Sequence, residues 1–202
     1  MIDATGREGW MHCAQQIYYT MKATEPLLRF AADIAERKGE YFKDFSTWAK
    51  KHLEEEREHY LWYQSDLAAM GMDPNVVDNT IPDPNILRLI GAQFSLVAIT
   101  NPSAILGYFY ATECQPSDAD EVRSLADRFS IPRKALRTIL FHCSADQDHQ
   151  IEIRELVDKY SNNSGCYRSM LASAEEALTG WTLLFKDCCE RPSTTIRSVS
   201  HD

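Results

Sequence analysis

Apolar residues recur at helical spacing between residues 42 and 70 and predict one long α-helix, which also carries histidine and carboxylate side chains at that spacing. Four potential metal ligands occupy positions i, i+3, i+4 and i+7, namely His52, Glu55, Glu56 and His59. On a continuous helix these positions share one face. A solvated charged face is the alternative, because Glu54 and Glu58 stand among them. Trp48 and Trp62 at the same period favour a helix that is at least partly buried.

A second run of potential ligands occupies positions i, i+4 and i+7 of a later helix. It consists of His142, Asp146 and His149. These side chains stack along one stripe of the helix. The stripe is surrounded by apolar residues, which place it beside a packed interior: Leu136, Ile139, Leu140 and Ile153. Two buried histidines can be hydrogen-bonded core residues, but a carboxylate between them at the same pitch favours a metal site.

Glu113 is the third element, and it ends the apolar run of residues 105–112. A carboxylate in such surroundings is costly to bury unless it is paired, protonated or bound to a cation. The alternative is a helix-end glutamate that reaches water. Glu113 is therefore a candidate ligand only in combination with the two runs.

The remaining pattern predicts an all-α fold, because no segment shows the two-residue period of a strand. Pro26 is expected to end one helix and begin another, and Asn101-Pro102 to break the apolar segment 86–113. Proline, aspartate and asparagine predict a loop over residues 72–85. The other expected elements are a helix ending near residue 129, a helix from Pro132 that carries the second run, a turn at 161–165, and a last helix at 167–185.

The chain of 202 residues suits one helical domain over residues 1–190, followed by a polar tail at 191–202. The net charge of −9, without any cluster of Lys and Arg, argues against nucleic acid as a partner. No apolar stretch approaches the roughly 20 residues that cross a bilayer. We therefore expect no membrane association and a cytoplasmic location.

Three predicted helices together present histidine and carboxylate groups inward, which is how helical bundles build carboxylate-bridged sites for two metals. Mixed imidazole and carboxylate ligation suits oxygen-reactive non-haem iron, and manganese is chemically possible. The six cysteines follow no zinc-ligand spacing, so a structural zinc is not expected. The residues alone thus favour a di-iron protein.

The same residues carry a resemblance to a known family. The first motif is the run His52-Leu-Glu-Glu55-Glu56-Arg-Glu-His59 with Trp62, Asp66, Leu67 and Gly71 after it. The later motifs are Gly107-Tyr108 leading to Glu113, and then His142-x3-Asp146-x2-His149. In this order, over roughly residues 15–160, they resemble the heme-oxygenase-like diiron oxidases and oxygenases.

The resemblance implies a heme-oxygenase-like seven-helix bundle without haem, two Fe(II) ions per chain, and O2 as co-substrate. It also implies a small amino-acid-like or fatty-acid-like substrate, a role in natural-product biosynthesis, and a possible homodimer. Five family ligand positions carry over directly, to His59, Glu113, His142, Asp146 and His149. For the sixth we favour Glu56, with His52 as a further ligand or as a residue that orients one. Glu55 either orients a ligand or faces solvent.

Two other functions fit the same residues. A metal-free enzyme on this fold, such as a thiaminase-like hydrolase or a cofactor-biosynthesis enzyme, would need a nucleophile, for which Cys114 or Cys143 could serve. A ferritin-like storage or interaction protein would repeat a Glu-x-x-His pair on two helices, and only Glu56 with His59 has that spacing. Under the diiron hypothesis, aromatic residues are candidates for the cavity wall: Phe94, Tyr108, Phe109 and Tyr110.

Overall fold

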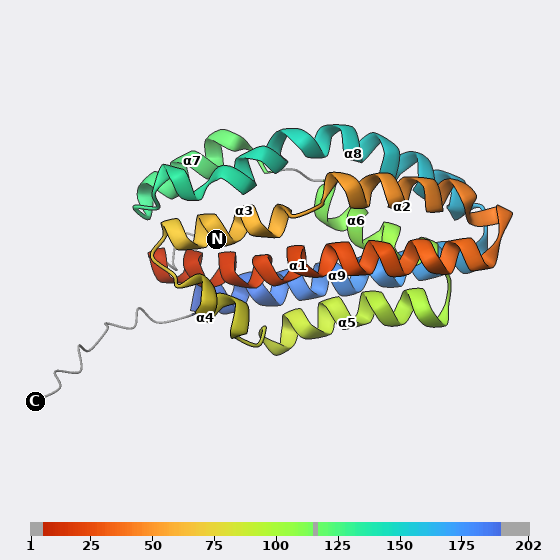
Figure 1. Cartoon of the computed structure of the whole chain (residues 1–202), viewed down its shortest axis with the longest axis horizontal. Coiled ribbons are helices and arrows are strands. Elements are labelled where there is room, and N and C mark those ends of the chain that lie inside the picture. Colours follow the sequence, from red (N-terminus) through yellow and green to blue (C-terminus); the bar gives the residue numbers. More distant parts are fainter. Residues whose placement is uncertain (1–5, 115–116, 191–202) are drawn as a thin grey trace, which may run out of the picture.

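Helices make up the regular structure of the part of the chain that is described (Figure 1). The structure is a computed structural model, and it describes residues 6–114 and 117–190, apart from the side chains of residues 145–148. The predicted all-α class is confirmed. The elements in order are α1 (Gly6–Lys38), η2 (Glu40–Phe42), α2 (Lys43–Glu55), α3 (His59–Ala69), α4 (Pro74–Asn79), α5 (Pro84–Ile99), η3 (Pro102–Ala104), α6 (Ile105–Glu113), α7 (Ala119–Arg128), η4 (Arg133–Ala135), α8 (Arg137–Ser161) and α9 (Ser164–Glu190).

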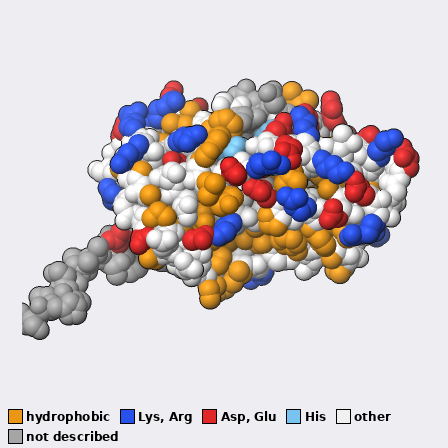
Figure 2. Space-filling model, viewed as in Figure 1, with side chains coloured by type: hydrophobic (Ala, Val, Ile, Leu, Met, Phe, Trp, Pro, Cys, Tyr) orange, Lys and Arg blue, Asp and Glu red, His pale blue; other side chains and the backbone are white. Residues whose placement is uncertain are grey.

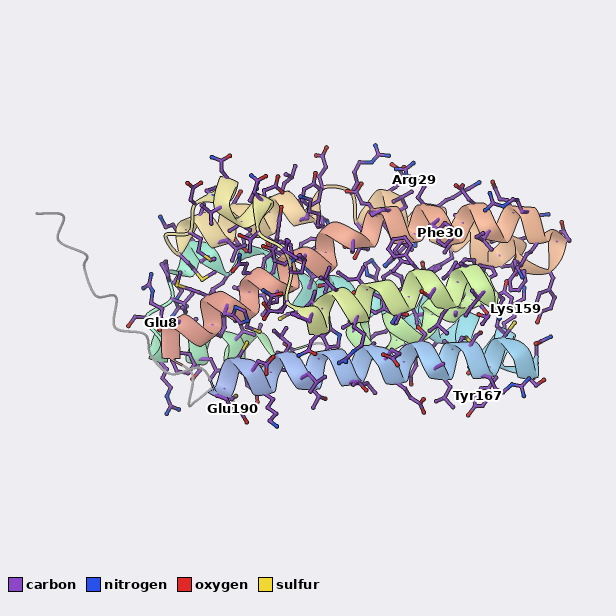
Figure 3. The ribbon with its side chains drawn as sticks, turned by 90° about the horizontal axis from the view of Figure 1, so that it is seen from below. Glu8, Arg29, Phe30, Lys159, Tyr167 and Glu190 are labelled. Atoms are coloured by element: carbon purple, nitrogen blue, oxygen red, sulfur yellow. The ribbon has the colours of Figure 1, made fainter. Side chains whose placement is uncertain are left out.

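The long helix α1 lies at the centre of the arrangement. Helices α2 and α3 pack along one side of it, and α5 and α9 pack on the other (Figure 1). Figure 3 shows α1, α5 and α9 from below, where Phe30 on α1 faces α5 and contacts Phe94 with ring centroids 5.7 Å apart. Helix α8 covers α2 and α3, and α6 packs against both α8 and α9. This arrangement brings α2, α3, α6 and α8 together.

Pro26 does not end a helix, so that prediction was wrong. Helix α1 runs through it without interruption, from Gly6 to Lys38. Proline inside a helix removes one backbone hydrogen bond, which costs about 3 kcal/mol. Leu27, Leu28 and Ala31 immediately beyond it are buried against the core. Packing of this face offsets the local cost and keeps the helix continuous.

The predicted helix over residues 42–70 is divided into α2 and α3, so the expectation of one continuous helix was also wrong. The chain turns at Glu58, whose φ of 64° lies in the left-handed region that L-residues with a side chain rarely adopt. The backbone N–H of Glu58 donates a hydrogen bond of 2.7 Å to the carboxylate of Glu25 on α1. A carboxylate at the start of a helix satisfies an otherwise unpaired N–H group there. A hydrogen bond to the central helix α1 therefore holds the break between α2 and α3.

Helix α6 approaches α9 closely because residue 107 is glycine. A Cβ atom at Gly107 would lie 1.9 Å from the backbone oxygen of Met170. No side chain fits in that space, since real Cβ contacts are longer than 3 Å. The close approach fixes the position of α6, and Glu113 is its last residue.

The helix expected from Pro132 begins at Arg137 instead, after η4, because Pro132 has an extended backbone with ψ of 134°. The last helix is also longer than predicted, since α9 covers Ser164–Glu190 rather than 167–185.

The other helix boundaries follow the sequence more closely. The breaks at Asn101-Pro102 and before Asn163 occur as predicted, and Asp118 begins α7 by accepting hydrogen bonds from the N–H groups of Asp120 and Glu121. The region 72–85 contains the short helix α4, which the loop prediction missed. Because of α4 and the break at Glu58, the described residues form nine α-helices rather than seven.

Two further expectations concern the C-terminal tail and membrane-spanning helices. The predicted polar tail, 191–202, lies outside the described residues. None of the helices in the described ranges combines the length and the apolar character that a membrane span requires.

Candidate metal centre

Three helices contribute one side chain each to a first group of potential ligands. His52 comes from α2, Glu113 from the end of α6, and His149 from α8. Glu113 Oε1 lies 3.3 Å from His52 Nε2, and Glu113 Oε2 lies 3.1 Å from His149 Nδ1. One donor atom of each residue lies within 4.8 Å of the other two. We refer to His52, Glu113 and His149 as the three-helix triad.

A second group forms where the chain turns between α2 and α3. Glu56 follows the last residue of α2, His59 is the first residue of α3, and His142 comes from α8. Glu56 Oε2 lies 3.1 Å from His59 Nδ1 and 3.8 Å from His142 Nε2. These donor atoms also lie within 4.8 Å of one another. We refer to Glu56, His59 and His142 as the helix-break triad.

The orientation of His142 is fixed by the start of α8. Its Nδ1–H donates a hydrogen bond of 2.9 Å to the carbonyl oxygen of Thr138, so Nε2 is the nitrogen that faces Glu56. The N–H of Thr138 in turn donates a hydrogen bond of 2.9 Å to the buried carboxylate of Asp66 on α3. Hydrogen bonding of the outer ring nitrogen is the usual way in which proteins orient a metal-binding histidine. Asp66 and Thr138 therefore hold His142 in a ligand-like orientation.

Both carboxylates stay ionised in spite of their burial. Burial acts to raise the pKa of Glu56, but the neighbouring imidazole rings of His142 and His59 outweigh it, and the pKa lies well below its ordinary value. Burial likewise acts to raise the pKa of Glu113, and the neighbouring His52 and His149 lower it below its ordinary value. The charge of Glu56 opposes that lowering. The two triads are thus close enough to influence each other electrostatically.

The same carboxylate charges shift the pKa of His149. Burial acts to lower its pKa, but the hydrogen bond to Glu113 and the charges of Glu113, Glu56 and Glu55 raise it above the ordinary value. A cation placed between these groups would substitute for the imidazolium proton, because it interacts with the same carboxylates. The carboxylates of the site therefore favour a bound cation.

The donor atoms fit divalent iron. Each triad offers two imidazole nitrogens and one carboxylate, and such mixed ligation is typical of non-haem iron. In addition, His52 Nδ1 is buried without a hydrogen-bond partner among the described residues, and the Glu55 carboxylate is 3.8 Å from it. Buried polar atoms are rarely left in that state unless an ion or a water molecule binds nearby. An ion bound at Nδ1, beside the Glu55 carboxylate, would satisfy this atom, whereas an ion bound at Nε2, beside Glu113, would leave it unpaired.

Six of the seven residues predicted as ligands thus lie together, in two groups of three. Asp146 is part of α8, but its side chain lies outside the described residues, so its role as a ligand stays a prediction. Glu56 and His52 were alternatives for one position in the sequence, whereas the structure places them in different triads. Glu55 lies beside the three-helix triad, with Oε2 3.6 Å from His149 Nε2. That geometry favours the orienting role that was left open for Glu55.

A pocket of about 530 Å³ opens next to both triads. It is lined by Lys51, Glu55, His59, Phe141, His149, Ile151 and Glu152. His59 belongs to one triad and His149 to the other, so a ligand in this pocket can reach both. In Figure 2 histidine atoms are visible at the surface between hydrophobic side chains on one side and mixed acidic and basic side chains on the other.

The aromatic residues that the sequence suggested for the cavity wall do not line this pocket. Phe109 instead packs with its ring against His52, with centroids 4.9 Å apart, and Phe94 packs against Phe30. Sequence reasoning missed Lys51, Ile151 and Glu152, because they lie outside the buried helix faces that carried the recognisable pattern: Lys51 and Ile151 are exposed, and Glu152 is partly buried. Their only signal was position, one residue before His52 and two and three residues after His149.

Neither cysteine proposed as a nucleophile lines the pocket, as far as the structure describes its wall. Cys114 is buried at the end of α6, and Cys143 is partly buried on α8. The described geometry gives a metal-free cysteine mechanism no support.

The helical arrangement defines a heme-oxygenase-like fold. A crystal structure of a domain of unknown function with this fold, from Shewanella denitrificans OS217, is similar to the chain with a TM-score of 0.75 and 22% sequence identity, over 88% of this chain and 77% of that one. A search of the curated proteins finds no match. The model of the family described as iron-containing redox enzyme matches residues 51–182, and the chain belongs to that family. The predicted fold and family are confirmed.

Proposed function

We propose that the protein is a non-haem diiron enzyme that uses O2 to oxidise or oxygenate a small amino-acid-like or fatty-acid-like molecule. The observation that carries the proposal is the pair of His/carboxylate triads beside one pocket. Membership of the iron-containing redox enzyme family supports it. A place in natural-product biosynthesis, where such oxidations are common, is part of the same proposal.

The three-helix triad would hold one iron and the helix-break triad the other, with Asp146 as a further ligand. When bound, the iron pair supplies the electrons for O2 reduction. The protein itself holds the imidazole rings in position through Asp66 and Thr138, and it keeps both carboxylates ionised. Buried aromatic rings limit water around His52, which stacks on Trp48 with centroids 5.0 Å apart. The pocket orients the substrate against His59 and His149.

The test is an anaerobic titration of the metal-free protein with Fe(II), followed by exposure to O2 in the presence of amino acids or fatty acids. We expect uptake of about two irons per chain, and a change in visible absorbance on O2 exposure that is coupled to an organic product. His142→Ala should lower the iron content and abolish the product. Absence of iron uptake by the wild-type protein would refute the proposal, and O2 consumption without an organic product would indicate iron storage.

A further inference from the structure

The imidazole rings of His52 and His149 each lie between two carboxylate groups. On the inner side, Glu113 lies 3.3 Å from His52 Nε2 and 3.1 Å from His149 Nδ1. On the outer side, Oε2 of Glu55 lies 3.8 Å from His52 Nδ1 and 3.6 Å from His149 Nε2. Each ring thus turns one nitrogen toward Glu113 and the other toward Glu55, and the three-helix triad accounts only for the inner pair of nitrogens.

The contacts on the two sides differ in kind. A neutral imidazole ring has one nitrogen that carries a proton and one that carries a lone pair. Glu113 is ionised and only accepts hydrogen bonds, so the inner nitrogens of both rings donate to it. The outer distances of 3.6 and 3.8 Å are too long for hydrogen bonds. The neutral rings of the metal-free protein therefore direct two lone pairs toward Glu55.

The Nδ1 atom of His52 points to a bound ion on the outer side. His52 is fully buried, and Nδ1 has no hydrogen-bond partner among the described residues, which is unfavourable for a polar atom. Two atoms that bind one ion at about 2.1 Å lie roughly 3.0–3.4 Å apart. The distances from Glu55 to the two outer nitrogens are only slightly longer, and the ring centroids of His52 and His149 lie 4.5 Å apart. An ion shared by these three side chains would satisfy His52 Nδ1.

The outer side is the more accessible of the two. Glu55 and His149 line the pocket of about 530 Å³, whereas Glu113 is not part of the described pocket wall. The Glu55 side chain is 37% exposed, compared with 13% for Glu113. A cation that arrives from the pocket therefore meets Glu55 before it meets Glu113.

The charges around the outer side favour a cation even when the helix-break triad is occupied. Lys51 supplies the ammonium group there, which pairs with Glu152 and lies 3.4 Å from Glu55 Oε1. Glu55, Glu56 and Glu113 all act electrostatically on His149. Together with Glu152, these carboxylates outnumber the charges of Lys51 and one divalent ion, so a second divalent ion is still attracted. Lys51 competes with that ion for Glu55.

We propose that His52 Nδ1, His149 Nε2 and the Glu55 carboxylate form an outer position for a divalent cation, through which metal is loaded from the pocket into the three-helix triad. Two imidazoles and one carboxylate with open coordination positions are a ligand set typical of non-haem Fe(II). This inference rests on the proposed function, since the three-helix triad is one of its two metal positions.

The inner and outer positions exclude each other, because both use a lone pair of the same two rings. Glu113 orients the rings while the outer position is occupied, and Glu55 orients them while the inner position is occupied. When the ion moves inward, each ring releases the proton of its inner nitrogen and takes up one on its outer nitrogen from water in the pocket. The number of protons on each ring is unchanged.

The first test locates the ion, with Co(II) as the probe because its visible absorbance reports its ligands. In Glu113→Gln the inner position loses its charged ligand, while the amide oxygen still accepts a hydrogen bond. We expect this variant to bind one Co(II) in the helix-break triad and a second at least about tenfold more weakly. Anomalous scattering from crystals soaked in Co(II) should place the second ion about 2.1 Å from His52 Nδ1 and His149 Nε2. A second ion at His52 Nε2, or none, would overturn the proposal.

Lysine substitutions on α2 test the competition for Glu55. Lys51→Met removes the ammonium group beside Glu55, so the second Co(II) of Glu113→Gln should bind about threefold more tightly or better. Lys50→Met is the matched control, since Lys50 pairs with Glu36 on α1 instead. Weaker binding in the Lys51→Met variant, or equal effects of the two substitutions, would overturn the proposal.

Two adjacent carboxylates of α2 test the loading step. In stopped-flow experiments at saturating Co(II), Glu55→Gln should fill the three-helix triad about tenfold more slowly than the wild-type protein, because the entrance has lost a negative charge and a ligand. The final occupancy should remain about two ions per chain. Glu54→Gln is the matched control, since Glu54 is exposed and pairs with Arg57.

The outcomes distinguish this inference from the proposed function. Equal uptake rates in Glu55→Gln and Glu54→Gln, with two ions bound at the end, would overturn the outer position and leave the two-metal centre intact. Absence of Co(II) uptake by the wild-type protein would refute the outer position and the two-metal centre together.

Discussion

The two triads contain the same kinds of ligand but are built in different ways. The three-helix triad depends on packing, because its residues come from helices far apart in sequence, and His52 is fully buried between Trp48 and Phe109. The helix-break triad depends on a local turn, and the side chain of its member His142 is 23% exposed. One metal position is therefore preformed by the core, and the other requires a strained backbone at Glu58. We expect the two positions to respond to different substitutions.

The largest expected effect comes from removing one carboxylate at a time. Glu113→Ala should eliminate iron binding at the three-helix triad, and Glu56→Ala at the helix-break triad, each with a loss of affinity above about 100-fold. Anaerobic Fe(II) titration should then show about one iron per chain in either variant. Glu155→Ala, at an exposed position of α8, is the control. If Glu113→Ala retained both irons, the assignment of Glu113 to a metal position would be wrong.

The next largest effect is expected from Gly107→Ala, which disturbs helix packing and should affect iron binding by one triad only. In Gly107→Ala the new Cβ atom meets the backbone of α9, so α6 must move, and we expect a loss of about 3 kcal/mol in the free energy of unfolding. Because α6 carries Glu113, iron affinity at the three-helix triad should fall while the helix-break triad is spared. Chemical denaturation and iron titration measure the two effects.

Gly91→Ala is the matched control for Gly107→Ala. Gly91 lies on the exposed side of α5, and no atom lies within 4 Å of a Cβ built there. This substitution should raise the free energy of unfolding by up to about 1 kcal/mol, because alanine favours the helix. Equal destabilisation by both substitutions would show that the contact between α6 and α9 is not tight.

The contrast between the triads also shows what the sequence could predict. The ligands were identifiable because histidine and carboxylate residues recur at helical spacing, and the run on α8 keeps that spacing in the structure. The division of the ligands was not identifiable, since a continuous helix would put His52 and Glu56 on one face. The break depends on the bond from Glu58 to Glu25, which is 33 residues away in sequence. Contacts of that kind are set by tertiary packing and leave no local pattern.

The wrong prediction at Pro26 and the missed helix α4 also have physical explanations. The sequence predicts a helix end at Pro26 because proline destabilises a helix interior. The burial of Leu27 and Leu28, which offsets this destabilisation, depends on the tertiary fold and is not visible in the sequence. The short helix α4 was missed because the prolines and aspartates around it are also typical of loops. Asp73, one of those aspartates, in fact begins α4 by accepting a hydrogen bond from the N–H of Asn75.

A smaller effect concerns pH in the metal-free protein. The pKa of His149 is raised in the folded state, so its protonated form stabilises the fold below the ordinary value of about 6.5, and this contribution is lost as the pH rises through the raised pKa. The pKa values of Glu56 and Glu113 are lowered, so their contribution is present above about 4.3 and is lost at acid pH. Stability should therefore be greatest between these limits.

Thermal melts of the metal-free protein between about pH 6 and pH 9 test the alkaline side. The wild-type protein should melt at a lower temperature as the pH rises, and His149→Gln should flatten this dependence. Iron should reverse the trend, because ligand imidazoles must be neutral to bind a metal. An unchanged slope in His149→Gln would show that another group is responsible.

The smallest effect concerns the turn that forms the helix-break triad. Glutamate at position 58 adopts a left-handed conformation that costs about 1 kcal/mol for residues other than glycine, so Glu58→Gly should raise the free energy of unfolding by up to that amount. Glu155→Gly, in the interior of α8, should instead lower it by about 1 kcal/mol. Urea denaturation of both variants gives the comparison. Iron binding by the helix-break triad should survive in Glu58→Gly, because glycine retains the turn. If Glu58→Gly raises the free energy of unfolding and Glu155→Gly lowers it, the backbone strain is local to the break. If both substitutions lower it, residue 58 continues a helix, and a turn does not bring Glu56 and His59 to His142.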